Sequence, residues 1–164
     1  MIILGIDPGT SSIGYAILQT KPALHLLESA MVPIISQTPS GRLLELHTHL
    51  KLLLSKFRPE EVSLEKLFFA KNTKTAFSVS EARGVILLTT ALAGVPVSEY
   101  TPLEVKKTVT GDGVADKGQV KKMIQLTLKE TVTLKARDDV FDAIGVALTC
   151  FYRKRFENRV YPSI

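Results

Sequence analysis

Short apolar runs bounded by turn residues dominate the first 35 residues of the chain. Residues 2–6 are apolar and mostly β-branched, and Pro8-Gly9 follow them, which predicts a strand buried on both faces. Strand-like stretches come next at residues 13–19 and within 23–35, separated by Thr20-Lys21-Pro22. We expect these three strands to form an antiparallel meander.

Helical spacing alternates with strand patterns in the rest of the chain. Ser40 is the expected N-cap of a helix that ends before Pro59, and Gly94 is the expected end of a longer one. The predicted order after the meander is helix 40–58, strand 62–69, helix 72–93, strand 95–100, a short helix from Thr101-Pro102, and helices 118–128 and 136–156. This order predicts an α/β fold whose mixed sheet is part antiparallel and part parallel, with helices on both faces.

Composition places the chain among globular proteins with an anionic partner. With 164 residues, 45% of them hydrophobic, we expect one domain over residues 1–164. The net charge of +5 and the pI near 9.4 fit nucleic acid as that partner. The single Cys150 lies on an apolar helix face and is expected in the core. No signal peptide or membrane span is evident, which predicts a soluble cytoplasmic protein.

Asp7 is the first polar residue after the buried first strand. A charge at such a position is costly to desolvate unless it is paired or bound to a cation, so Asp7 is a candidate metal ligand. A turn-capping role, in which the side chain bonds the Gly9 or Thr10 amide, explains the same residue equally well. The sequence around Asp7 leaves both interpretations open.

Glu65 is a charged residue within an otherwise apolar predicted strand. Alternation puts Val62 and Leu64 on one face and Ser63, Glu65 and Leu67 on the other. If this strand lies beside the first one, the Glu65 carboxylate can approach Asp7. The alternative is a Glu that faces solvent on a half-exposed strand.

Asp138, Asp139 and Asp142 lie at the start of the last predicted helix. Residues three or four apart share a helix face, so Asp142 can project together with either of the other two. A favourable interaction with the helix dipole explains Asp138 well and Asp142 poorly. Acids on a first strand, a fourth strand and a final helix form a set that can bind two hard divalent ions for phosphodiester hydrolysis.

Five motifs occur in order along the chain. They are Gly5-Ile6-Asp7-Pro8-Gly9 with Gly14-Tyr15, Glu65-Lys66-Leu67-Phe68-Phe69-Ala70-Lys71-Asn72, Ala82-Arg83-Gly84, Val105-Lys106-Lys107-Thr108-Val109-Thr110-Gly111 with Lys117, and Asp139 to Asp142-Ala143-Ile144. The first alone also occurs in actin-like ATPases and sugar kinases. All five together resemble the RuvC family of bacterial Holliday-junction resolvases over essentially the full length of the chain.

The resemblance implies a ribonuclease-H-like fold with a five-stranded mixed sheet. It also implies a Mg²⁺-dependent crossover junction endodeoxyribonuclease that resolves four-way DNA junctions by paired phosphodiester hydrolysis in recombination and repair. Two Mg²⁺ ions per subunit, replaceable by Mn²⁺, are then held by Asp7, Glu65, Asp139 and Asp142. Asp138 is an adjacent alternative to Asp139, and Lys66 replaces the Gln often found after the family's Glu.

The resemblance further assigns DNA contacts to Phe68, Lys106 and Lys117. An aromatic ring at Phe68 can stack on an unpaired base, although a core position explains it too, and for Phe69 the core position is favoured. Lys107, Lys121 and Lys122 either add phosphate contacts or are solvated helix lysines.

Paired nicks on a symmetric junction imply a homodimer, because one chain carries one set of acids. We expect the helix 72–93 to form the interface, with Phe77, Val79, Ile86 and Leu87 contributing. The family also implies a RuvA–RuvB branch-migration complex as partner. Rival functions are a related nuclease acting on another nucleic-acid structure, a non-catalytic DNA-binding module, and an actin-like ATPase, for which 164 residues are too few.

Overall fold

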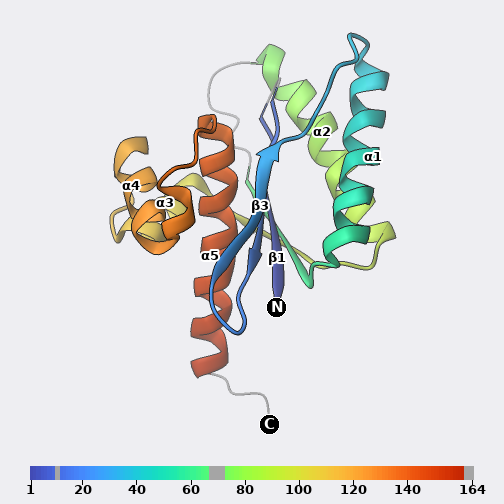
Figure 1. Ribbon diagram of the computed structural model, residues 1–164. Coiled ribbons are helices and arrows are strands. Elements are labelled where there is room, and N and C mark those ends of the chain that lie inside the picture. The colour runs from blue at the N-terminus through green and yellow to red at the C-terminus, as the bar shows by residue number, and fades with distance from the viewer. Residues whose placement is uncertain (10–11, 67–72, 161–164) are drawn as a thin grey trace.

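A five-stranded mixed sheet forms the centre of the computed structural model, which describes residues 1–9, 12–66 and 73–160 (Figure 1). The strand order is β3-β2-β1-β4-β5. The meander is antiparallel, whereas β4 pairs in parallel with β1 and β5 with β4. The predicted mixed sheet is therefore confirmed. The strands are β1 (Ile2–Asp7), β2 (Gly14–Gln19), β3 (His25–Met31), β4 (Glu61–Glu65) and β5 (Val97–Tyr100).

Helices cover both faces of this sheet, as the sequence predicts (Figure 1). Helices α1 and α2 pack together on one face, and α5 lies along the other face with α3 and α4 beside it. No helix in the described ranges is long and apolar enough to cross a membrane. The helices are α1 (Pro39–Phe57), α2 (Thr73–Leu92), α3 (Pro102–Thr110), α4 (Lys117–Thr127) and α5 (Asp138–Val160), with a short 3-10 turn at Lys129–Thr131.

The two faces of the sheet belong to two separate hydrophobic cores. Leu4, Ile6, Val62 and Leu64 pack with α1 and α2 in one core. Ile3 packs on the opposite side with α5, whose residues from Ala143 to Cys150 are all buried. Alternation along β1 thus serves both cores, because successive strand side chains point to opposite faces. Cys150 is fully buried, as expected.

Helix α5 lies unusually close to the backbone of the sheet, and two glycines permit this. A Cβ atom at Gly5 would lie 2.3 Å from the Ala143 main-chain oxygen. A Cβ atom at Gly14 would lie 2.1 Å from the Asp139 main-chain oxygen. The close approach fixes the first turns of α5 against the ends of β1 and β2.

The start of one helix and the end of one strand differ from the sequence prediction. Helix α1 begins at Pro39 and is capped by Thr38, whose hydroxyl accepts a hydrogen bond from the Gly41 N–H at 3.2 Å, so the prediction of Ser40 as the cap was wrong. The start of α3 is confirmed, since Thr101 and Glu104 form a capping box. Strand β4 ends at Glu65 rather than continuing toward residue 69, and residues 67–69 lie outside the described ranges.

Helix α2 exposes less of its apolar surface than the sequence suggested. Val79 and Ile86 are buried in the subunit's own core, so their expected place in an interface was wrong. Phe77, Leu88 and Leu92 remain exposed, at 76%, 60% and 73%. Together with the exposed Gly84 they form a stripe along the outer side of α2, which we call the α2 stripe.

Candidate active site

The carboxyl ends of two neighbouring parallel strands bring Asp7 and Glu65 together. Ile6 of β1 pairs with Leu64 of β4, so the acidic residue that follows each of them lies at the same sheet edge. The Ser63 hydroxyl donates to the Val146 carbonyl oxygen of α5 at 2.8 Å, which places this strand face toward α5. Glu65 shares that face by alternation. The predicted approach of Glu65 to Asp7 is therefore confirmed.

Burial and mutual repulsion dominate the electrostatics of this pair. Burial, followed by the charge of Glu65 and a hydrogen bond with it, raises the pKa of Asp7 from 3.8 to about 8. Burial also raises the pKa of Glu65, and the charge of Asp142 adds to that effect. Burial and the neighbouring carboxylates thus favour the protonated form of Asp7.

Helix α5 adds two further carboxylates from its first turns. The charges of Asp142 and Asp139 both raise the pKa of Asp7. Their side chains are 31% and 24% exposed, whereas Asp138 is 68% exposed and has turned toward solvent. The structure therefore groups Asp139 with Asp7, Glu65 and Asp142, and leaves Asp138 outside this carboxylate cluster.

The turn-capping interpretation of Asp7 finds no support at Gly9. The Gly9 N–H donates to the main-chain carbonyl oxygen of Asp7 at 3.0 Å rather than to its side chain. Thr10, the other expected partner, lies outside the described residues.

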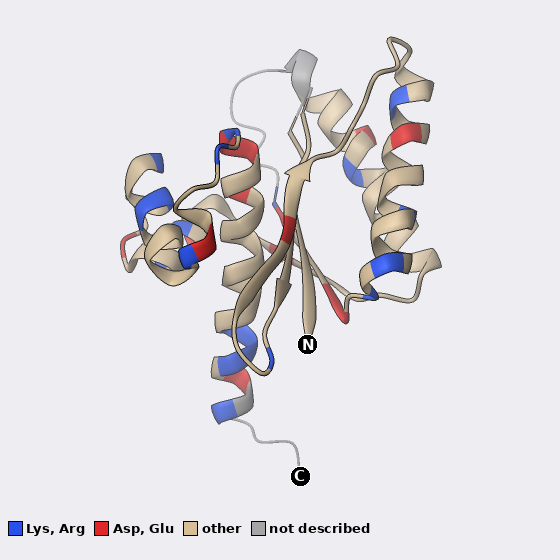
Figure 2. Ribbon diagram, in the orientation of Figure 1, with Lys and Arg blue, Asp and Glu red and all other residues tan. Residues whose placement is uncertain are grey.

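A basic side chain lies directly beside the carboxylate cluster. Lys117 Nζ lies 2.9 Å from Asp142 Oδ2 and 3.9 Å from Asp138 Oδ2. The hydrogen bond to Asp142 raises the pKa of Lys117. Figure 2 shows acidic residues at the first turns of α5 and basic residues on the neighbouring α3 and α4.

A small hollow of about 230 Å³ joins the cluster to the lysines that the sequence singled out. Glu65 and Asp142 line it together with Lys106 and Lys117. Lys107 and Lys122 point to solvent, and Lys121 Nζ lies 4.4 Å from the centre of the Phe141 ring, so these three contribute nothing to the hollow. Phe68 and Phe69 lie outside the described residues.

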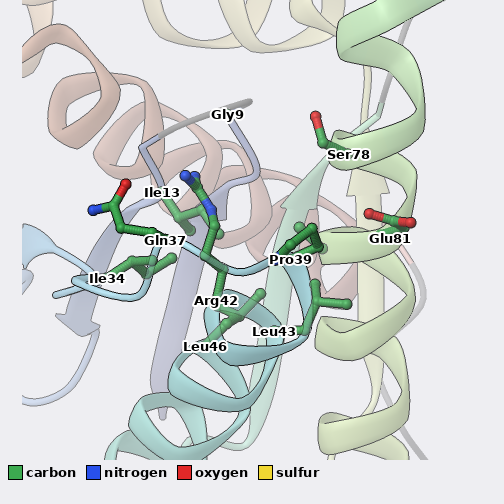
Figure 3. Close-up of a pocket in the computed structure, with 11 residues that line it drawn as sticks. Gly9, Ile13, Ile34, Gln37, Pro39, Arg42, Leu43, Leu46, Ser78 and Glu81 are labelled. Carbon is green, nitrogen blue, oxygen red and sulfur yellow. The ribbon is translucent and has the colours of Figure 1, made fainter.

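A pocket on the opposite face of the sheet has a different character (Figure 3). It has a volume of about 320 Å³ between α1 and α2 and reaches Gly9 at one edge. Arg42 and Glu81 are its charged lining residues, and apolar side chains such as Leu46 form much of the rest. Glu81 is the acidic residue in its lining, so this pocket lacks the grouped acids of the carboxylate cluster.

The chemistry of the carboxylate cluster fits a hard divalent cation. Its donors are all carboxylate oxygens, and the raised pKa of Asp7 shows that their negative charge lacks full compensation. Among residues 1–9, 12–66 and 73–160, no three acidic, His or Cys side chains converge tightly enough to hold an ion as they stand.

Comparison with known proteins gives the site its context. The family model described as crossover junction endodeoxyribonuclease RuvC matches residues 3–150. The chain belongs to the RuvC family. Among RuvC relatives, the proteins of Moorella thermoacetica and Brevibacillus brevis are 46% and 44% identical, over 90% and 91% of this chain and 89% and 90% of theirs.

A solved RuvC structure shares the fold of this chain. Thermus thermophilus RuvC in complex with a Holliday junction substrate superposes with a TM-score of 0.87 at 33% identity, covering 95% of this chain and 96% of that one. The ribonuclease-H-like fold predicted from the RuvC resemblance is thereby confirmed.

Two contacts to the cluster were missed by the sequence reasoning. The Ser12 hydroxyl donates to Asp139 Oδ1 at 3.0 Å, and Arg137 Nε lies 3.4 Å from Asp139 Oδ2. Arg137 could have been noticed because it precedes two aspartates at a helix start. No sequence pattern singles out Ser12, since only folding of the chain brings it next to Asp139.

Proposed function

We propose that this protein is a structure-specific endonuclease that resolves four-way DNA junctions by paired, metal-dependent phosphodiester hydrolysis. The convergence of Asp7, Glu65, Asp139 and Asp142 at one sheet edge, beside basic side chains, carries the proposal. Membership of the RuvC family supports the same reaction. Residues 1–164 are proposed to act as one nuclease domain.

The four carboxylates are the proposed holders of two Mg²⁺ ions per subunit, with Mn²⁺ able to replace them. When bound, such ions activate a water molecule and stabilise the leaving oxygen of a phosphodiester. Asp7 and Glu65 come from a rigid sheet edge, so they fix the position of the scissile phosphate relative to the chain. Asp139 and Asp142 complete the donor set from α5.

Lys106 and Lys117 are the proposed contacts to the phosphates that flank the scissile bond. Both line the hollow beside Glu65 and Asp142, which places two positively charged residues next to the acids. Phosphate contacts of this kind orient the DNA without reading its sequence. Phe68 is the proposed stacking partner for an unpaired base at the crossover.

A homodimer is the proposed working form. Two symmetric nicks need two sites, and the described part of the chain carries one carboxylate cluster. The α2 stripe offers exposed apolar surface that a second copy would cover, and a two-fold pair matches the symmetry of a junction. We further propose a cytoplasmic location and, as the family implies, cooperation with a RuvA–RuvB branch-migration complex.

Cleavage of a synthetic four-way junction, compared with a linear duplex of the same sequence, tests the proposal. We expect paired nicks on the junction in Mg²⁺, none in EDTA, and little cleavage of the duplex. Asp7→Asn should bind the junction without nicking it, and Glu157→Gln on the exposed end of α5 should match the parent. Junction binding without nicking by the parent in Mg²⁺ and Mn²⁺ would instead indicate a non-catalytic DNA-binding module.

A further inference from the structure

The two carboxylate oxygens of Asp139 have different kinds of partner. Oδ1 accepts a hydrogen bond from the Ser12 hydroxyl at 3.0 Å, and this contact is partly buried. Oδ2 lies 3.4 Å from Nε of Arg137, a side chain that is 67% exposed. One oxygen is thus held by the protein body, and the other by a solvated cation.

The two residues that follow Ser12 are anchored to the rest of the protein. The neighbouring Ile13 carbonyl accepts a hydrogen bond from the Val32 N–H at 2.8 Å, which ties this segment to the chain that follows β3. A Cβ atom at Gly14 would lie within 2.1 Å of the Asp139 main-chain oxygen, so the segment and the first turn of α5 are in direct contact. The Ser12 hydroxyl therefore reaches Asp139 from a residue whose next two neighbours in the chain are anchored.

We propose that Ser12 is a positioning residue that presents Asp139 to a divalent ion, and that Arg137 competes with that ion for the same carboxylate. The inference rests on the proposed metal-dependent function. Ser12 takes one lone pair of Oδ1, so we assign the ion to Oδ2, whose partner is the exposed Arg137 side chain. Arg137 Nε lies 3.4 Å from Oδ2, so an ion that binds this oxygen has to displace the Arg137 side chain.

Loss of the Ser12 contact and loss of the Arg137 contact should change the metal affinity by different amounts and in opposite directions. Hydrogen bonds that orient a metal-ligating carboxylate typically change metal affinity by about 10–100-fold. An exposed ion pair is weak, so the competition from Arg137 should change the affinity by only about two- to threefold. Loss of Ser12 should weaken metal binding, whereas loss of Arg137 should strengthen it.

Metal binding without DNA provides the test. Unfolding midpoints are recorded against Mn²⁺ and Mg²⁺ concentration, because an ion that binds only the folded state raises the midpoint. Ser12→Ala should raise the half-saturating concentration about tenfold, Ser12→Thr should restore it, and Arg137→Gln should lower it about twofold. Ser40→Ala and Arg155→Gln, at exposed positions of α1 and α5, are matched controls expected to behave as the parent.

Junction cleavage gives a second readout. Ser12→Ala should need about tenfold more Mg²⁺ for half-maximal cleavage while its junction Kd stays unchanged. Equal metal dependence of Ser12→Ala and the parent would overturn the role of Ser12. Weaker metal binding by Arg137→Gln would overturn the competition. If the parent itself shows no metal-dependent midpoint and cleaves in EDTA, the proposed function fails instead.

Discussion

Replacement of Asp7 by Asn should stabilise the metal-free protein, and the gain should grow with pH. The pKa of Asp7 is raised from 3.8 to about 8 because the side chain is buried beside other carboxylates. The folded protein therefore binds this proton more tightly than the unfolded chain, and stability falls as the pH rises from about 4 to about 8. Asn carries no such charge, so its contribution does not change over that range.

The size of the stability gain follows from the shift in the pKa of Asp7. A shift of about four units, at about 1.4 kcal/mol per unit, sets an upper limit near 6 kcal/mol at pH 8. Water entry and side-chain rotation relieve part of this cost, so we expect about 2–4 kcal/mol. In a protein of this size, that gain corresponds to a rise in Tm of about 5–15 °C.

Thermal unfolding in EDTA at pH 5 and pH 8 measures this effect. Asp7→Asn should unfold well above the parent at pH 8, and the difference should shrink at pH 5. Saturating Mg²⁺ should stabilise the parent and leave the variant almost unchanged. Asp138→Asn, at an exposed acid outside the carboxylate cluster, is the control and should follow the parent closely. A Tm difference that is the same at both pH values would refute the reasoning.

Four further predictions concern cleavage and assembly. Asp142→Asn should abolish junction cleavage while gel-shift binding stays equal or becomes tighter, since negative charge near phosphate is removed. Phe68→Ala should lose cleavage more than binding, because the lost stacking on a base costs about 1–3 kcal/mol. A large drop in its melting temperature would show instead that Phe68 is a core residue. Lys117→Ala should slow cleavage without unfolding the protein, as measured by single-turnover kinetics and a thermal melt. Leu88→Glu on the α2 stripe should convert a dimer into a monomer in sedimentation, whereas a parent that is already monomeric would contradict the dimer.

The strands and the antiparallel pairing of the first three could be predicted because their signals are local. Alternation along β4 predicts Val62 and Leu64 on one face and Ser63 and Glu65 on the other. In the structure, Val62 and Leu64 pack in one core and Ser63 faces α5. The place of Glu65 beside Asp7 followed once β4 was assumed to lie next to β1. Hydrophobic burial decides which face of β4 is apolar, so the pattern of apolar positions predicts that face. The pattern does not predict which strand lies next to β4.

The choice between Asp138 and Asp139 could not be made from helical spacing, because either residue can share a face with Asp142. The rotation of α5 decides it, and that rotation is set by contacts far away in the sequence. The helix backbone at Asp139 rests on Gly14, which turns Asp139 inward and leaves Asp138 in solvent. The cap of α1 at Thr38 was missed for a simpler reason, since two hydroxyl residues lie close together there and the spacing does not distinguish them.

Junction cleavage measured against Mg²⁺ concentration for the parent, Asp139→Asn and Asp138→Asn tests the central claim most directly. The account predicts that the parent and Asp138→Asn make paired nicks that require Mg²⁺. Asp139→Asn should bind the junction and leave it intact at every Mg²⁺ concentration. Full cleavage by Asp139→Asn together with loss in Asp138→Asn, or cleavage by the parent in EDTA, would contradict the carboxylate cluster described above as the metal-dependent catalytic centre.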